Sequence, residues 1–557
     1  MKNLKASHQA QEPVMKVART KIGLSRVDRI GGEHGMSEQE QDHSLGSIRA
    51  FSSILFPRID KEGSEETQEP PEFFRDLNLD QVVNAITSGW DEFNLKPFFY
   101  KHLKDTDTII YRQEVMRDLE DEQVMEAITW FTERMRVTLR YLKHSEDLGY
   151  KEQKEGWFLE SVKVYGEAVN GLSSRLDDLP LASRGLRSLR EFLAAYLHSN
   201  GFKKLSDETK KLADDLAAIR YSLIIKGNRI TVRDYDGEED YAAVVEETFR
   251  KFSCGEAKDY RREFKGSGMN HVESWILERV AWLNKPVFKR LEKFSTDHAR
   301  YLNDKIAGFY REIQFYVAYL GYMREFHRAG LSFCYPQVSG DKEERVQGAF
   351  DLALAHSLIY QQGTIVPNGF YLNGPERIIV VSGPNQGGKT TFARMFGQLH
   401  YLASIGCPVP GTKARLFLFD NILTHFEREE DIANLRSKLE DDLLRIRQIL
   451  ERATPNSIFI MNEAFASTTV NDALVLSKRI LEKITQLDAL CVFVTFLDEL
   501  SSLNEKTVSM VSTVDPNDPA VRTYKLERRP ADGLAYAIAI ARKHGVTYEQ
   551  LKERIGE

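Results

Sequence analysis

One segment constrains the fold of this chain more than any other. Residues 383–390 read GPNQGGKT and fit the pattern G-x-x-x-x-G-K-[ST] in full. The residues before them, 377–381, form a short β-branched run typical of a buried parallel strand, and residues 391–401 have a helical pattern. Such a loop turns successive N–H groups around phosphate oxygens, and the N-terminus of the following helix adds the positive end of its dipole. The segment therefore predicts a strand, loop and helix that bind a nucleoside triphosphate.

Within this loop the side chains have distinct expected roles. Lys389 is expected to reach the β- and γ-phosphates, and the Thr390 hydroxyl to bind Mg²⁺. The residues expected to bind the nucleotide are Gly383, Pro384, Asn385, Gln386, Gly387, Gly388, Lys389, Thr390 and Thr391. A glycine-rich turn of no function is the alternative, and the flanking pattern argues against it.

A second apolar run, residues 457–461, predicts another buried strand, which ends in Asn462 and Glu463. P-loop enzymes need an acidic pair here: the first residue helps to hold Mg²⁺ through water, and the second polarises the attacking water. An amide oxygen accepts a hydrogen bond from a metal-bound water but carries no charge. Asn462 therefore predicts weak metal binding and slow hydrolysis, with Glu463 as the catalytic base. A helix N-cap region is the alternative interpretation of this pair.

Composition excludes several classes of protein. The chain has 557 residues, enough for about three or four domains. Its net charge of -7 argues against a generally basic nucleic-acid coat but leaves room for a local basic patch. The four cysteines form no C-x-x-C pair, so we expect neither a zinc site nor a disulfide framework, as suits the cytoplasm. The longest apolar run, near residues 489–497, is too short to span a bilayer, so no membrane role is expected.

The pattern along the chain predicts four parts. Residues 1–72 read as a flexible tail and linker, 73–200 as an all-helical core domain, 201–335 as two long lever helices, and 336–557 as a doubly wound α/β domain that contains the loop. The second lever helix is predicted as one continuous helix that includes Phe288 and Ile313. The levers enclose a short insertion, about 223–270.

The insertion opens with a hairpin signal. Residues 222–226 and 229–233 are strand-like and flank Gly227-Asn228. Basic residues then alternate with aromatic ones, a composition that can hold a phosphate backbone and stack on bases. The candidate nucleic-acid contacts are Arg229, Arg233, Lys258, Arg261, Arg262 and Lys265. Acidic residues are mixed in, so a solvated charged face stays open as the alternative.

Residues 383–391 closely resemble the GPNMGGKST phosphate loop of the MutS proteins, the DNA mismatch-repair ATPases. Residues 430–437 resemble the family's DDLASGRS stretch, whose serine, here Ser437, contacts the γ-phosphate bound by the partner subunit. Asp472 falls at the aspartate of the family's loop after the Walker B strand. Residues 536–546 resemble the C-terminal helices that brace the dimer, and 103–114 the start of the core domain.

The resemblance implies a multidomain fold, with α-helical core and lever domains followed by an α/β P-loop (ABC-type) ATPase domain and dimerisation helices. It implies a homodimer in which ATP, with Mg²⁺, binds residues 383–391 of one subunit and is completed in trans by Ser437 of the other. The expected function is a nucleotide-driven clamp on mismatched, branched or otherwise distorted DNA in repair or recombination.

Departures from the family pattern limit this expectation. Asn462 replaces an aspartate, Leu435 a glycine and Phe496 a histidine, while residues 465–467 replace a Gly-Arg-Gly segment. These changes touch phosphate, metal or water positions, so we expect an ATPase of slow turnover. No N-terminal mismatch-reading domain with its Phe-x-Glu motif and no C-terminal Smr module is found, and direct mismatch recognition is therefore in doubt. Two alternatives stay open: a nucleotide-gated clamp on structured RNA or the ribosome, and a weakly hydrolysing ATP-binding scaffold.

Overall fold

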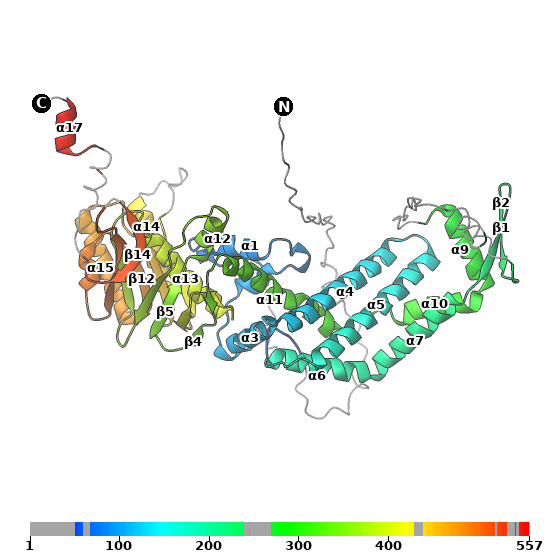
Figure 1. Cartoon of the computed structure of the whole chain (residues 1–557). Coiled ribbons are helices and arrows are strands. Elements are labelled where there is room, and N and C mark those ends of the chain that lie inside the picture. The colour runs from blue at the N-terminus through cyan, green and yellow to red at the C-terminus, as the bar shows by residue number, and fades with distance from the viewer. Residues whose placement is uncertain are drawn as a thin grey trace, which may run out of the picture. The chain divides into compact units, whose positions relative to one another are not determined.

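The computed structural model describes residues 51–58, 67–238, 244, 269–427, 438–518, 521–531, 541 and 545–555. They form two compact units (Figure 1). The helical unit contains the described residues of 49–64 and 105–320, and the α/β unit those of 65–104 and 321–557. Residues 73–104, predicted as part of the helical core domain, thus belong to the α/β unit. The predicted boundaries of the four parts stay predictions.

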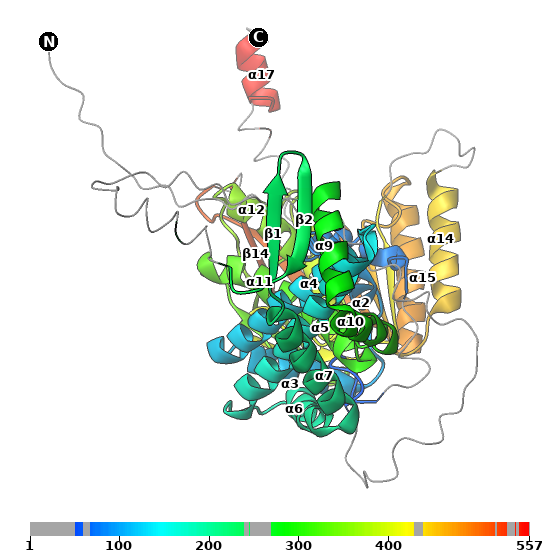
Figure 2. The same cartoon turned by 90° about the vertical axis from the view of Figure 1, so that its right-hand side faces the viewer.

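The helical unit is built on a pair of long antiparallel helices, α4 and α5, which lie side by side (Figures 1 and 2). Phe131 of α4 and Tyr165 and Leu172 of α5 are completely buried. The helices α3, α4, α6, α7 and α9 each begin after a side chain that accepts hydrogen bonds from N–H groups of the first turn. The helices of this unit are α3 (Thr106–Leu119), α4 (Glu122–Asp147), α5 (Lys151–Asp177), α6 (Arg184–His198), α7 (Asn200–Ala217), α9 (His271–Leu283), α10 (Lys285–Asp297) and most of α11 (Asp304–Arg328).

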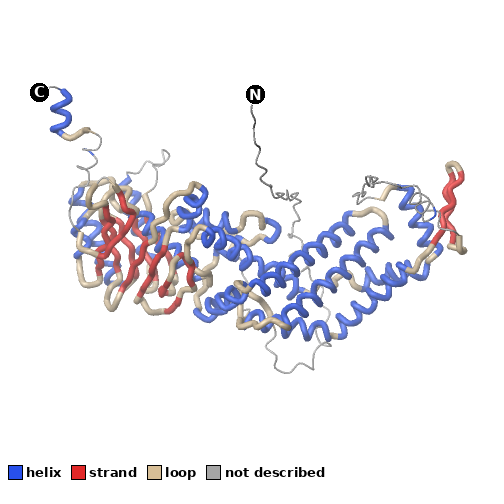
Figure 3. The backbone as a smooth tube through the Cα atoms, viewed as in Figure 1, coloured by secondary structure: helices blue, strands red, loops and turns tan. Residues whose placement is uncertain are grey.

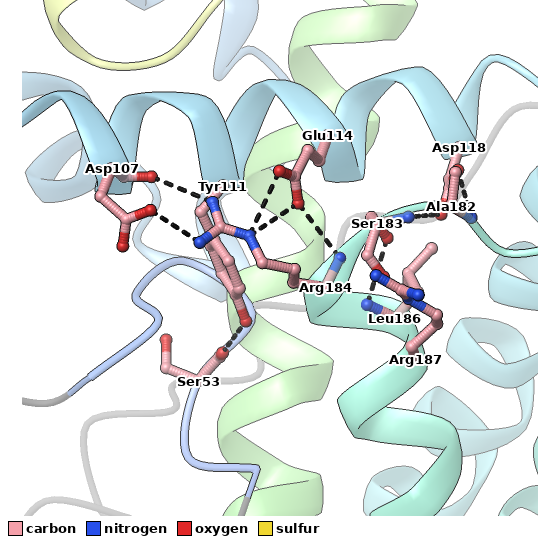
Figure 4. A network of polar contacts seen from close by, with 10 residues as sticks. All are labelled: Ser53, Asp107, Tyr111, Glu114, Asp118, Ala182, Ser183, Arg184, Leu186 and Arg187. Carbon is pink, nitrogen blue, oxygen red and sulfur yellow. Dashed lines mark hydrogen bonds and ion pairs between the residues drawn. The ribbon is translucent and has the colours of Figure 1, made fainter. Parts of the chain in front are cut away.

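A polar network fixes the start of α6 on α3 (Figure 4). Arg184 donates to Asp107 at 2.6 Å and to Glu114 at 3.0 Å. One turn along α3, the Asp118 carboxylate accepts from the backbone N–H of Ser183 at 2.8 Å. These charge-assisted bonds hold two helices that are far apart in the sequence.

The predicted hairpin is confirmed. Strands β1 (Tyr221–Lys226) and β2 (Arg229–Asp234) pair antiparallel, with Lys226 opposite Arg229. Gly227 has a φ of 60°, the left-handed conformation that a two-residue hairpin turn requires. Helix α9 lies beside β2 (Figure 2).

The prediction of one continuous second lever helix is wrong. Helix α10 ends at Asp297 and α11 begins at Asp304. Between them Tyr301 is buried against Phe158, and its hydroxyl donates to Ser161 at 3.1 Å. Asn303 then starts the new helix by accepting from the N–H of Lys305 at 3.0 Å. The helical spacing of apolar residues continues across the break, and so the sequence pattern conceals it.

The α/β unit is organised around a six-stranded sheet in the order β10-β11-β12-β7-β13-β14, in which only β14 runs antiparallel. The strands of this unit are drawn in red in Figure 3. A four-stranded sheet, β4-β9-β5-β6, and a two-stranded pair, β3-β8, accompany it. The strands are β3 (Phe333–Cys334), β4 (Gln337–Ser339), β5 (Glu344–Ala349), β6 (Asn368–Leu372), β7 (Ile378–Ser382), β8 (Val409–Pro410), β9 (Lys413–Phe417), β10 (Asn421–His425), β11 (Ser457–Asn462), β12 (Leu490–Val494), β13 (Thr507–Val514) and β14 (Arg522–Arg528). The helices and 3₁₀ turns are η2 (Glu72–Phe74), α1 (Leu79–Ile86), η3 (Asp91–Phe93), α2 (Lys96–Tyr100), α12 (Leu352–Tyr360), α13 (Lys389–Ser404), α14 (Lys438–Arg452), α15 (Val470–Leu487), η4 (Asp498–Ser502) and α17 (Tyr548–Ile555).

Both faces of the central strands are covered, as a parallel sheet requires. Alternate residues such as Val380, Phe459 and Phe493 form one core with α14 and α15. The opposite face carries α13, where Ile460 lies close to Gly397. The predicted strands at 377–381 and 457–461 are confirmed as β7 and β11, and the fold class, helical regions followed by an α/β region with a parallel sheet, is confirmed as well.

Candidate functional site

The glycine-rich loop joins β7 to α13 and bends back over the start of the helix. Gly383 and Gly388 have φ angles of 113° and 94°, and Gln386 has one of 58°. The Lys389 ammonium donates hydrogen bonds to two groups of the loop, Gly383 O at 2.9 Å and Asn385 Oδ1 at 3.2 Å. Residues of the loop and of the start of α13 line one cavity.

Close packing against β13 explains why glycines are needed here. A Cβ atom on Gly387 would lie 2.2 Å from Ser512 Oγ, and one on Gly383 would lie 2.8 Å from Ser512 O. The Ser512 hydroxyl donates to Gly387 O at 2.6 Å and ties the loop to the sheet. No larger side chain fits at either position unless the loop moves.

Lys389 is almost fully buried, and burial lowers its pKa. The carboxylates of Glu463 and Asp498 act in the opposite direction, and Arg522 adds to the lowering. A cation with so little water around it is stabilised by an anion, because that anion replaces the lost hydration. The electrostatics therefore favour a negatively charged ligand at this lysine.

The end of β11 lies directly beside the loop. The Thr390 hydroxyl donates to Asn462 Oδ1 at 2.9 Å, and Asn462 is 8% exposed. The next residue, Glu463, has a φ of 52°, and its N–H donates to Val494 O at 3.0 Å on the neighbouring strand. This left-handed conformation is costly for a glutamate and is common at functional sites.

A cavity of about 470 Å³ lies next to the loop. Its polar lining comes from the loop, the start of α13, Asp351, Asn368 and Glu463. Its apolar lining comes largely from segments that carry no motif: Phe350, Leu354, Leu358, Ile365, Val366 and Tyr524. A pocket lined by both polar and apolar side chains suits a nucleotide, because the phosphates need the first and the base needs the second.

Asn368 fixes the backbone around Tyr524, which lines this cavity. Its side chain donates to Tyr524 O at 3.0 Å and accepts from the N–H of Leu526 at 2.9 Å. Tyr524 has a φ of 57° and is half exposed over the pocket. Sequence reasoning missed both the residues of α12 and Tyr524, because an apolar run and an edge strand give no signal of a ligand.

The structure brings most of the predicted nucleotide residues together. Asn385, Gln386, Gly388, Lys389, Thr390, Thr391 and Glu463 line the cavity. Gly383, Pro384 and Gly387 shape the loop without lining it, and Asn462 touches Thr390. Asp472 accepts a hydrogen bond from Thr469 in the first turn of α15. Ser437 lies outside the described residues.

The predicted nucleic-acid residues are only partly described. Arg229 and Arg233 are exposed on β2 and, being four residues apart on a strand, share one face of the hairpin. Arg233 is paired with Glu238, which partly neutralises it. Lys258, Arg261, Arg262 and Lys265 lie outside the described residues.

Two negative findings concern the described part of the chain. None of its helices has the length and apolar character needed to cross a membrane. Nor do three or more histidine, cysteine or acidic side chains gather there in a way that could hold a metal. Cys334, Cys407 and Cys491 are free thiols.

Comparison with known proteins gives a consistent result for the α/β unit. Residues 379–553 match the family model MutS domain V. The DNA mismatch repair protein MutS of Geobacillus sp. (strain WCH70) is 31% identical over 211 residues, which are 37% of this chain and 24% of that protein. The DNA mismatch repair protein MutS of Solibacter usitatus (strain Ellin6076) is 27% identical over 335 residues, 58% of this chain and 36% of that protein. The protein of the same name from Petrotoga mobilis is 30% identical over 188 residues. The chain therefore spans about a quarter to a third of the length of these relatives.

Proposed function

Because the chain belongs to the MutS family through its domain V, we propose that it is a MutS-like ATP-binding protein and slow ATPase. Its nucleotide-driven dimer clamp binds mismatched, branched or otherwise distorted DNA in repair or recombination. The observation that carries this proposal is the cavity beside the glycine-rich loop, with the buried Lys389 in its lining. The curated relatives named above are DNA mismatch repair proteins, which supports the choice of DNA.

The cavity suggests how ATP is oriented. The triphosphate binds to the N–H groups of the loop and to the Lys389 ammonium, and the base packs against the apolar lining from α12 and Tyr524. Glu463, a carboxylate in the cavity lining, accepts a proton from the attacking water. Each role needs only a group that the cavity already presents.

The residues present fit Mg²⁺ poorly. Thr390 and Asn462 offer only neutral oxygens, and the Thr390 hydroxyl donates its hydrogen to Asn462 Oδ1. Mg²⁺ instead prefers one or two carboxylates beside the phosphates. When bound with ATP, the ion would supply positive charge that offsets the charge of the phosphates. We propose that Thr390 and Asn462 hold it weakly, through water, and that hydrolysis is slow for this reason.

A homodimer accounts for apolar surface that this chain leaves uncovered. Helix α17 buries none of its residues, and Tyr548, Leu551 and Ile555, which share one helical face, are exposed. Phe496, next to the end of β12, is half exposed as well. In the proposed dimer Ser437 of the partner completes each ATP site, and closing of this interface moves the lever helices.

The hairpin β1–β2 is the described part of the proposed clamp. Arg229 and Arg233 on one face of β2, together with Lys258, Arg261, Arg262 and Lys265, contact the phosphate backbone. A clamp on structured RNA or the ribosome is the alternative for the same basic residues. A weakly hydrolysing ATP-binding scaffold is the other, and the neutral Asn462 favours it.

Nucleotide binding is tested with the variant Lys389→Ala. Titration calorimetry with ATP should show a loss of at least about 100-fold in affinity, because a buried charge that faces the phosphates is removed. Lys413→Ala, at an exposed lysine of the same unit, is the matched control and should bind normally. Unchanged ATP affinity in Lys389→Ala contradicts the site.

The substrate is tested separately by gel shift. Four-way junction DNA, mismatched duplex, perfect duplex and structured RNA are compared at one stated salt concentration, with and without ATP. We expect the distorted DNAs to bind more tightly than the perfect duplex, and ATP to change that binding. Preferential binding of RNA favours the first alternative, and binding of no nucleic acid favours the scaffold.

A further inference from the structure

We infer that Asp351 selects the base of the nucleotide: one oxygen of its carboxylate accepts a hydrogen bond from the exocyclic amino group of adenine. ATP then binds more tightly than triphosphates whose base lacks this donor. The inference rests on the proposed ATP site and deepens it. It makes Asp351 a specificity-determining residue that contacts the base and not the phosphates.

The position of Asp351 is the first step. It is the residue at which α12 begins, it is 5% exposed, and it belongs to the lining of the cavity. Leu354 and Leu358, about one and two turns further along the same helix, line the cavity as well. Asp351 is therefore a buried carboxylate within the apolar lining against which the base is proposed to pack.

The hydrogen bonds of Asp351 distinguish its two oxygens. Oδ1 accepts from the N–H groups of Ala353 at 3.0 Å and Leu354 at 3.2 Å, and from Gln398 Nε2 at 2.8 Å. Every hydrogen bond that the described residues donate to this carboxylate ends on Oδ1. Three donors saturate that oxygen, and the lone pairs of Oδ2 are left to accept a donor from a molecule in the cavity.

Gln398 holds this arrangement in place. Its Nε2 also donates to Leu77 O at 2.9 Å, and its Oε1 accepts from the N–H of Leu352 at 2.7 Å. Because both ends of the amide are bound, its N–H₂ group is the end that faces Asp351. The atom at the position of Oδ1 must therefore be an acceptor.

The same bonds exclude a phosphate from this part of the cavity. The N–H groups of Leu352, Ala353 and Leu354 are the first of α12, and all three are donated to side chains of the protein. The carboxylate that they surround repels a phosphate. The triphosphate therefore belongs at the glycine-rich loop, and the uncharged base belongs beside Asp351.

The charge of Asp351 favours a donor on the base. Burial raises the pKa of this carboxyl, whereas its hydrogen bonds and the Arg394 guanidinium lower it. An N–H of the base at Oδ2 adds one more donor to the charged form and stabilises it further. A base that presents a carbonyl oxygen instead leaves two acceptors facing each other, and it is rejected.

The test is titration calorimetry of the full chain with ATP, purine riboside triphosphate and ITP, at about pH 8, which favours the charged carboxylate. The substituent that distinguishes the three bases is an amino group in ATP, a hydrogen in the purine riboside and a carbonyl oxygen in ITP. We expect the unmodified protein to bind ATP at least about tenfold more tightly than either of the others.

Asp351→Asn should reverse this preference. The donors of Ala353, Leu354 and Gln398 require the oxygen of the new amide at the position of Oδ1, so its N–H₂ group replaces Oδ2. A donor then faces the base, and ITP should bind at least about threefold more tightly than ATP. Asparagine caps a helix as well as aspartate does, so the fold should be kept. Asp121→Asn, the same change at the exposed N-cap of α4, is the matched control and should still prefer ATP.

A second variant separates the cap from the selection of the base. Asp351→Ser keeps one capping oxygen but has no second one, so it should bind ATP and purine riboside triphosphate equally. Equal affinities of the unmodified protein for these two nucleotides overturn the inference, and so does an unchanged preference for ATP in Asp351→Asn. Failure of the proposed function looks different, since the unmodified protein would then bind none of the three nucleotides.

Discussion

The contact between Gly387 and Ser512 leads to a quantitative prediction for the variant Gly387→Ala. A Cβ atom would lie 2.2 Å from Ser512 Oγ and 2.9 Å from Pro384 O, whereas ordinary contact begins at 3.4 Å. The hydroxyl contact must therefore open by 3.4 − 2.2 = 1.2 Å, which also breaks the bond from Ser512 Oγ to Gly387 O. Overpacking costs about 1–3 kcal/mol and the lost hydrogen bond about 1 kcal/mol. If this strain falls on the binding-competent loop, ATP affinity falls by about 30-fold to 1,000-fold.

Titration calorimetry with ATP measures the effect, and a second substitution isolates its cause. Ser512→Ala removes the hydroxyl, so the double variant should recover about half of the lost binding free energy, a coupling of about 1–2 kcal/mol. Gly340→Ala is the matched control, because its Cβ meets nothing within 4 Å. Affinity of Gly387→Ala within threefold of the unmodified protein, or no rescue by Ser512→Ala, refutes the steric reasoning.

Three further predictions concern stability, measured by urea unfolding. Burial raises the pKa of Glu155 to about 7, above its unfolded value, so the protein loses stability as pH rises from about 4.5 past 7. Glu155→Gln should therefore raise the free energy of unfolding by about 1–2 kcal/mol at about pH 8 and by almost nothing at about pH 4.5. An equal increase at the two pH values would contradict the raised pKa of Glu155. Burial alone would raise the pKa of Asp488, but hydrogen bonds from three cationic side chains lower it to about 2. The contribution of Asp488 to the free energy of unfolding is therefore lost as pH falls from about 4 toward 2. Because Asp488 is 40% exposed, Asp488→Asn should cost only about 1 kcal/mol at neutral pH, and a loss that persists at about pH 2 counts against the ion pairs. Arg184→Met should lower the free energy of unfolding by about 1–2 kcal/mol. Arg184→Lys should recover little of this loss, because lysine lacks the planar guanidinium group that reaches both Asp107 and Glu114. Full recovery in Arg184→Lys would show that the positive charge alone suffices.

The sequence predicted the parts of the site whose chemistry is local. The loop, its flanking strand and helix, and the hairpin around Gly227 all follow from short-range rules, and the structure contains them. The break between α10 and α11 does not, because the burial of Tyr301 is decided by residues of α5. Local propensity could not reveal such a tertiary contact.

The apolar wall of the cavity was unpredictable for a similar reason. Leu354 and Val366 lie in neighbouring segments of the sequence, but Tyr524 belongs to a strand that is distant from them in the sequence. Only the fold brings these three residues together. Residues 73–104 likewise join the α/β unit through particular contacts, such as the bond from Tyr401 to Phe99 O at 2.7 Å. The periodicity that predicted helices there carries no information about which core those helices cover.

The proposed account depends on ATP occupying the cavity between the loop and α12. Photolabelling with 8-azido-ATP, followed by peptide mapping, tests this most directly, since the azide reacts with whatever lies beside the base. The account predicts label in peptides from α12 to Val366 or around Tyr524, suppressed by excess ATP and absent from Lys389→Ala. Label confined to other peptides, or label that Lys389→Ala leaves unchanged, contradicts it.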